Sequence, residues 1–207
     1  MDSDMIKLCK ERLEKKIKKQ KADLIRKEVE HHRSIMTPLY EKRNEVIKTI
    51  PNFWLTVFLN NKTLSKQLNN TDKKIFEFLS SIEVDKFEAG HSIDFVFQTN
   101  DYFSNTNLKK TFTYNEDGEL VSINSTKIDW KPNKGIPDKI DHNNEGLSTS
   151  NLSFFHWFYS TMEKDELIFE DKIAGIIKDE VFPDALKFLD DDHNNLEGEG
   201  PSEERNY

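Results

Sequence analysis

Cysteine, glycine and long apolar runs are scarce in this chain. Cys9 is the only cysteine in 207 residues, which excludes a disulfide scaffold and a cysteine-rich zinc module and fits a reducing compartment. No stretch approaches the ~18 consecutive apolar residues of a membrane span, and the N-terminal residues lack the apolar core of a secretory signal. We therefore expect no membrane partner. No glycine precedes Gly90, and Pro38 and Pro51 are the only prolines before it, so this part favours long helices.

The composition is polar but sufficient for a folded core. Hydrophobic residues make up 35% and charged residues 33% of the chain, against ~45–50% apolar and ~25% charged in an ordinary globular domain. Fifteen Phe, three Trp and five Tyr supply large apolar side chains, which argues against wholesale disorder. The length fits one domain with an appendage, since domains span ~100–200 residues.

Charge is divided unevenly along the chain, whose net charge is −8. Residues 1–49 hold 14 Lys and Arg against 9 Asp and Glu, net +5, and the other 158 residues hold 16 against 29, net −13. Residues 160–207 alone hold 15 acids and 5 bases, net −10. An acidic second half repels nucleic-acid phosphates and attracts basic partners. The alternative is a well-solvated acidic protein whose charge serves only solubility.

Residues 1–50 are predicted to form one long helix that joins two copies of the chain. They are rich in good helix formers, and their apolar residues recur in steps of three, four and seven, as in a coiled coil. About 45 helical residues would span ~68 Å, whereas the other residues, if compact, form a body ~40 Å across. The helix therefore overshoots its own domain, and we expect a homodimer whose contact uses Leu13, Ile17, Leu24, Val29 and Met36. A solvated single helix with a basic face is the alternative, and Pro38 is a candidate kink.

Residues 51–189 are predicted to form an α+β domain. Two short helices are expected first, at 53–58 and after an N-cap at Thr71. Alternating apolar residues and a turn at 115–118 then predict an antiparallel sheet of about four strands, at 82–87, 93–97, 108–114 and 119–130. Helical periodicity returns over 152–189. The fold class is therefore α+β, a long N-terminal helix followed by a four-stranded antiparallel sheet with helices on one face.

Motifs of catalysis and metal binding are missing. The chain contains no G-x-G-x-x-G, Walker A, H-E-x-x-H or G-x-S-x-G sequence, so we expect no enzyme, cofactor or metal. Asp190 to His193 are adjacent acids and a histidine without fixed geometry, and His156 has no predicted nucleophile or carboxylate partner. The lysines between Lys15 and Lys21 have no interleaved aromatic residues, which argues against sequence-specific nucleic-acid binding.

Four aromatic segments, in this order and behind the long helix, carry a resemblance to a known family. Each has a sound interpretation as core, but together with PLYEKRNEVIKTIPNFW at 38–54 they resemble the nucleosome assembly protein family, and most of all its SET-like branch. The resemblance covers residues ~5 to ~190, and the segments that carry it are IPNFWLTVFLN at 50–60, IDFVFQTNDYF at 93–103, STKIDWK at 125–131 and SFFHWFY at 153–159.

The resemblance implies a histone chaperone with no catalytic reaction of its own. Members of this family are dimers joined by paired long helices, each carrying an α+β "earmuff" domain, and they bind core histones through the acidic underside of that domain. We therefore expect core histones as partners, either or both of the two core-histone pairs, assistance to nucleosome assembly, and a location in nucleus and cytoplasm. The acidic residues that match the binding stretch are Glu163, Asp165, Glu166, Glu170, Asp171, Asp179, Glu180 and Asp184.

The chain departs from the family pattern in two places. Its acidic tail, residues 190–207, is short and is expected to be disordered, either because the lineage has a short tail or because the chain has been shortened. The loop at 131–150 lacks the basic run of some relatives, so no nuclear import signal is predicted. Two alternatives to the chaperone remain open: an acidic dimeric inhibitor of an enzyme, as in SET relatives, and a dimeric scaffold without histone transfer.

Overall fold

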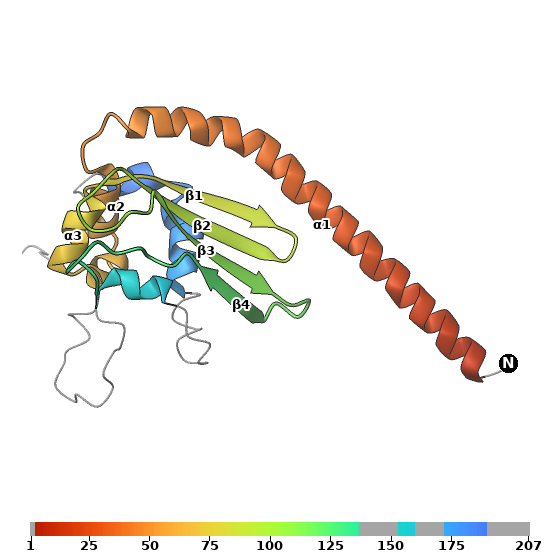
Figure 1. Cartoon of the computed structure of the whole chain (residues 1–207). Coiled ribbons are helices and arrows are strands. Elements are labelled where there is room, and N and C mark those ends of the chain that lie inside the picture. Colours follow the sequence, from red (N-terminus) through yellow and green to blue (C-terminus); the bar gives the residue numbers. More distant parts are fainter. Residues whose placement is uncertain (1–2, 137–152, 160–171, 190–207) are drawn as a thin grey trace, which may run out of the picture.

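A long helix leads into a compact body. The computed structural model describes residues 3–136, 153–159 and 172–189. Helix α1 spans Ser3–Ile47, 45 residues, and its N-terminal end projects beyond the body (Figure 1). Pro38, which cannot donate a backbone hydrogen bond, lies inside α1, and the helix continues through it in a gentle curve over the sheet (Figure 1). Among the described residues, no helix is both long and apolar enough to cross a membrane.

Two short helices follow, as predicted. Helix α2 spans Phe53–Asn60, and α3 spans Asn70–Phe76 after the 3-10 helix η1, Leu64–Gln67. The prediction of Thr71 as the N-cap of α3 is wrong. The cap is Asn69, whose side chain accepts hydrogen bonds from the backbone N–H groups of Thr71 and Asp72 at 2.8 and 2.9 Å. The Asp72 carboxylate accepts in return from Asn69 N at 3.0 Å, a capping box that stabilises both residues as the start of α3.

The sheet is the predicted antiparallel meander, in the order β1-β2-β3-β4. The predicted turn before β4 is present. Gly118 takes a φ of 81°, and Asn115 Oδ1 accepts from the backbone N–H groups of Asp117 and Glu119 at 3.0 and 2.8 Å. The strands are β1 Leu79–Phe87, β2 Gly90–Phe97, β3 Asn107–Tyr114 and β4 Leu120–Ser125.

The prediction that the last strand continues to Trp130 is wrong. Strand β4 ends at Ser125, and Trp130 forms only an isolated bridge with Phe103. Its indole Nε1 donates to the Tyr159 hydroxyl at 2.8 Å. The apolar alternation continues past Ser125 because Ile128 and Trp130 still pack on the core, although from an irregular segment rather than from the ladder.

The core lies between one face of the sheet and a cover of helices. Phe95 of β2 is central, with its ring centroid 6.3 Å from Phe58 of α2 and 5.7 Å from Phe154. The segment expected to be helical around 152–158 is the 3-10 helix η3, Phe154–Phe158. A helical turn from residue 172 continues into the π-helix η4, Ile176–Val181, and the 3-10 helix η5, Ala185–Phe188, follows. Asn60 of α2 holds the end of η5 by donating to Phe188 O at 2.8 Å.

A buried carboxylate ties η3 to α3. Asp72 is fully buried, and it accepts from Ser153 Oγ at 2.6 Å and from Phe154 N at 2.7 Å. Burial raises the pKa of Asp72, and hydrogen bonds from Ser153, Phe154 and Asn69, together with the charge of His156, oppose that rise. One side chain therefore completes the capping box of α3 and fixes the start of the aromatic segment.

Candidate functional site

The structure covers part of the predicted acidic binding stretch. Glu163, Asp165, Glu166, Glu170 and Asp171 lie outside the described residues. The remaining three acids, Asp179, Glu180 and Asp184, are all exposed to solvent on η4 and the turn after it. The described part of the predicted site is therefore available to a partner.

The opposite side of η4 is apolar, as the periodicity predicts. Ile177 and Val181 are buried in the core, and Ile176 is half-buried against it. Asp179 and Glu180 follow on the polar side of the same element. Because the carboxylates and the core contacts occupy different sides, the charges can be changed without removing apolar packing.

The three described carboxylates differ in how they are engaged. Asp179 Oδ2 lies 2.7 Å from Lys178 Nζ, and its Oδ1 lies 4.0 Å from Lys86 Nζ of β1. Glu180 and Asp184 form no ion pair with another described residue. Exposed pairs of this kind contribute little, about 0–1 kcal/mol each, so a basic partner can replace them.

Arg43 of α1 holds this acidic segment in place. Its guanidinium lies between two rings, 4.6 Å from the Tyr40 centroid and 4.7 Å from the Phe182 centroid. It also donates to the backbone carbonyl of Phe182, the residue after η4. Burial lowers the pKa of Arg43, partly offset by Tyr40. No local sequence pattern predicts this contact, because Arg43 and Phe182 are 139 residues apart.

We expect Arg43→Ala to loosen the acidic segment and to lower the free energy of unfolding by about 2–3 kcal/mol. That figure combines a charge-assisted hydrogen bond with a stacked cation–π contact. Chemical denaturation monitored by tryptophan fluorescence measures it. Arg43→Lys is the matched control: it keeps the charge but lacks the planar group, so it should recover only part of the loss. Wild-type stability in both variants would contradict the role of Arg43 in holding the acidic segment.

The residues predicted for dimerisation do not share one face of α1. Leu13, Ile17 and Leu24 are 59%, 55% and 67% exposed. Val29 and Met36 are half-buried and face the body of their own chain. The five residues from Leu24 to Val29 turn the helix by about 140° at ~100° per residue. The single apolar stripe read from the sequence is therefore two rows. The outer row faces solvent and consists of Leu13, Ile17, Leu24, Ile35, Leu39 and Val46.

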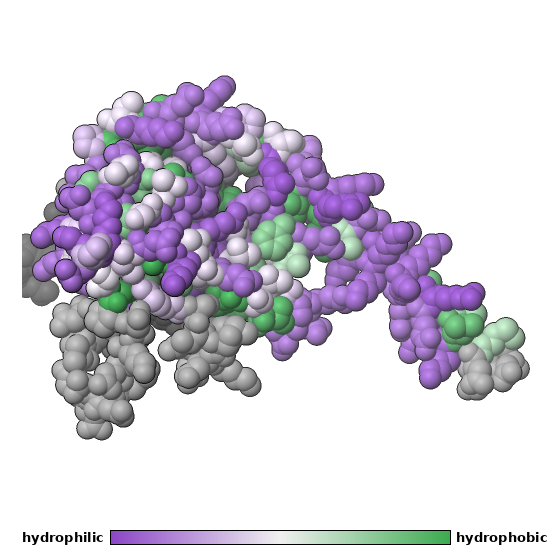
Figure 2. Space-filling model, in the orientation of Figure 1, coloured by the Kyte–Doolittle hydropathy of each residue, from purple (hydrophilic) through white to green (hydrophobic). Residues whose placement is uncertain are grey.

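A groove of about 870 Å³ lies between α1 and the outer face of the sheet. Figure 2 shows the hollow between helix and body, with hydrophilic residues over most of the helix surface in that view. At one end of the groove Arg33 of α1 donates to Asp85 Oδ1 of β1 at 2.7 Å. Lys18 and Glu116, at the turn before β4, form a second ion pair between α1 and the body. The helix thus meets the ends of both hairpins.

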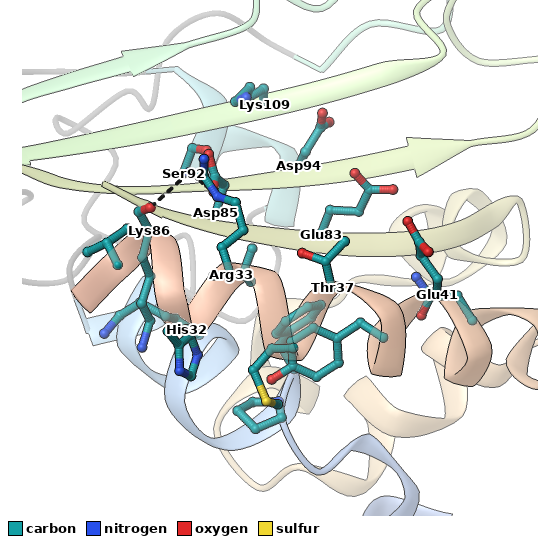
Figure 3. Close-up of a pocket in the computed structure, with 18 of the residues that line it drawn as sticks. His32, Arg33, Thr37, Glu41, Glu83, Asp85, Lys86, Ser92, Asp94 and Lys109 are labelled. Atoms are coloured by element: carbon teal, nitrogen blue, oxygen red, sulfur yellow. Dashed lines mark hydrogen bonds and ion pairs between the residues drawn. The ribbon is translucent and has the colours of Figure 1, made fainter. Parts of the chain in front are cut away.

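The other end of the groove is acidic. Glu41 comes from α1, Glu83 from β1 and Asp94 from β2, and Figure 3 shows them along one side of the pocket, away from the Arg33–Asp85 pair. Glu83 and Asp94 are direct partners in the ladder, and Asp94 is in turn opposite Lys109 of β3. The sequence prediction missed these acids. The alternation in the sequence predicts that Asp94 lies on the face of the sheet away from the core, but it does not predict which residue of the neighbouring strand lies opposite Asp94.

The residues with metal-ligating or nucleophilic side chains lie apart from one another among the described residues. Within residues 3–136, 153–159 and 172–189, no group of three or more His, Cys, Asp or Glu residues could hold a metal ion. His156 Nδ1 lies 3.1 Å from Ser153 O, and Cys9 is exposed on α1. The run of acids and a histidine from Asp190 to His193 lies outside the described residues.

Comparisons with known proteins agree on one family. The family model described as nucleosome assembly protein (NAP) matches residues 9–192. NAP1-related protein 2 of Arabidopsis thaliana is 36% identical over 192 residues, 89% of this chain and 75% of that protein. Protein SET of Drosophila melanogaster is 30% identical over 197 residues, 89% of this chain and 71% of that protein.

Solved structures show the same architecture. The nucleosome assembly protein of Plasmodium falciparum matches with a TM-score of 0.63 and 28% identity, over 90% of this chain and 93% of that one. The Vps75 histone chaperone matches with a TM-score of 0.59 over 87% of this chain and 97% of that one. At 21% identity, the second likeness shows the fold alone.

Proposed function

Because the chain belongs to the nucleosome assembly protein family, we propose that it is a histone chaperone that binds core histones and assists nucleosome assembly. It acts without chemistry of its own, by shielding the positive charge of histones until DNA takes them. Histones otherwise bind DNA nonspecifically through phosphate neutralisation. Many weak, screened ion pairs give useful affinity and still release the cargo to DNA, whose charge density is higher.

The observation that carries the proposal is the exposed acidic side of η4. Asp179, Glu180 and Asp184 reach solvent, while the opposite side of the helix is anchored in the core and by Arg43. A rigid support for exposed carboxylates lowers the entropy lost on binding. We propose that the acids at 163–171 also contact histones and that the chain works in nucleus and cytoplasm.

Reversing Asp179, Glu180 and Asp184 to Lys tests the proposal. We expect roughly a tenfold or greater loss of affinity for labelled core-histone pairs, since three attractions become repulsions of about 0.5 kcal/mol or more each. The loss should shrink as salt rises, because the Debye length falls from about 8 Å at physiological strength. Fluorescence anisotropy over a salt series, with each of the two core-histone pairs, measures both effects.

The matched control reverses Glu11, Glu14 and Asp23 on α1. It changes the net charge by the same amount but lies away from η4. Equal losses from both triple variants would mean that histones respond only to net charge. The surface on η4 would then be wrong, and an acidic scaffold or enzyme inhibitor would explain the chain better.

A further inference from the structure

The acidic end of the groove holds carboxylates that the protein itself does not neutralise. Glu41 and Glu83 form no ion pair or side-chain hydrogen bond with the described residues, and Asp94 accepts only from Asn107 Nδ2, at 3.2 Å, through Oδ2. The other carboxyl oxygen, Asp94 Oδ1, is buried and has no hydrogen-bond partner among the described residues. A buried, unpaired acceptor is costly to maintain, and here it lies at the wall of an open groove.

The strand register adds a repulsion to this cost. Glu83 and Asp94 are directly opposite on neighbouring strands, and like charges in that position destabilise a sheet. Lys109 is opposite Asp94 on the other side, but its ammonium group is not within 4.0 Å of that carboxylate. A cation entering the groove would relieve the repulsion between Glu83 and Asp94.

Three of the basic residues at the groove are already engaged elsewhere. Arg33 pairs with Asp85 at 2.7 Å, and Lys178 pairs with Asp179 at 2.7 Å while Lys86 lies 4.0 Å from the same carboxylate. Three carboxylates line the acidic end, and Lys109, which also lines the groove, forms no ion pair with another described residue. The charge of this end is therefore negative, and its complement is a positively charged ligand.

The spacing of the acids decides which cation fits. The described residues offer no convergent set of three ligands for a metal ion, so the negative charges are spread along the groove between helix and sheet. Val29, Met36 and Tyr40 add apolar wall on the α1 side. Spread carboxylates in a groove that also has apolar wall suit an extended chain whose lysine or arginine side chains pair with the acids while their methylene stems lie on the apolar surface.

We propose that the acidic end of this groove, lined by Glu41, Glu83 and Asp94, binds an extended lysine- and arginine-bearing peptide segment. The inference rests on the proposed function, because a basic segment of that kind is what a histone cargo would supply. The outer row of α1 lies about 140° around the helix from Val29, so a helix-mediated dimer leaves the groove open.

A fluorescent twelve-residue peptide of alternating Gly and Lys tests the groove directly by anisotropy at low and physiological salt. The combined substitution Glu41→Gln, Glu83→Gln and Asp94→Asn should weaken peptide binding about tenfold. The control Glu88→Gln, Asp101→Asn and Asp117→Asn removes the same charge from exposed sites outside the groove and should weaken it less than twofold. Thr37→Trp, which fills the groove from α1 without changing charge, should weaken binding as much as the groove variant.

Each outcome bears on the proposal. Equal effects of groove and control variants, or no effect of Thr37→Trp, would overturn it. A groove variant that became monomeric would also overturn it, since the groove would then hold a second copy of the chain. The melting temperature of the groove variant should stay the same or rise, because the Glu83–Asp94 repulsion is removed; a collapse would leave Thr37→Trp as the deciding variant. If the wild-type protein bound the peptide but neither core-histone pair, the proposed chaperone function would be wrong, and the proposal that the groove binds a basic peptide would stand.

Discussion

Replacing Leu13, Ile17 and Leu24 with Asp should convert a dimer into a monomer. The outer row of α1 exposes these residues in the single chain, and a second copy is the simplest cover for them. The wild type should sediment at about 49 kDa, twice 24.4 kDa. Charges placed in a desolvated helix seam cost several kcal/mol, so we expect the dissociation constant to rise at least about 1000-fold.

The matched control uses two leucines of the same helix. Leu8 is 49% exposed but lies about 140° away from Leu13 around the axis. Leu13→Asp alone should weaken the dimer, and Leu8→Asp should leave it intact. A wild-type monomer at micromolar concentration, or equal effects of the two single substitutions, would contradict dimerisation through the outer row.

Removing the Asp72 side chain should have the largest effect on stability. Asp72→Ala removes the Asp72 half of the capping box of α3 and leaves the N–H of Asn69, the buried N–H of Phe154 and the hydroxyl of Ser153 without their acceptor. Unsatisfied buried donors cost about 1–3 kcal/mol each, so we expect a loss of about 3 kcal/mol or more. The melting temperature should fall by roughly 6–12 °C for a chain of this size. Calorimetry measures it.

Asp72→Asn separates the hydrogen bonds from the charge. An amide oxygen can accept from Asn69 N and Phe154 N, and its NH2 can donate to Ser153 Oγ, so Asn should destabilise far less than Ala.

Burial raises the pKa of Asp72 in the folded state. Protonated Asp72 therefore adds to the free energy of unfolding. This contribution is fully present below the pKa of Asp72 in the unfolded chain, near 3.9, and is lost as pH rises through its higher pKa in the folded protein. Wild type should lose stability relative to Asp72→Asn across that window. A constant difference from pH 3 to 7 would show that Asp72 does not titrate with folding.

The sequence predicted the order of elements because each has its own local signal. Good helix formers and the absence of glycine predicted α1, and period-two alternation with Asn115–Gly118 predicted the β3–β4 hairpin. The predicted boundaries of the elements were wrong where tertiary contacts overrode the local sequence preference. Trp130 kept the alternation but left the sheet to bond Tyr159, and Asn69 displaced Thr71 as cap because Asp72 completes the capping box.

The site was less predictable than the fold, for a geometric reason. The acids of η4 could be proposed from the sequence because they are clustered in it and belong to a family pattern. Glu41, Glu83 and Asp94 are scattered over three elements, and only the register of β1 and β2 brings two of them opposite each other. Arg43 likewise acts across 139 residues. The patterns in a single sequence reveal its charge distribution and its hydrophobic periodicity, but they do not reveal which distant segments pair with each other.

The division of α1 into two apolar rows sets a rule for changes in its length. Val29, Met36 and Tyr40 must keep facing the groove, while Leu13, Ile17 and Leu24 face away from it. One residue inserted between Leu24 and Val29 would rotate everything before it by about 100° relative to the body. Insertions of seven or eleven residues nearly restore the phase. Helices in this family should therefore tolerate insertions of whole heptads or hendecads here and reject single residues, so the permitted lengths of α1 are discrete.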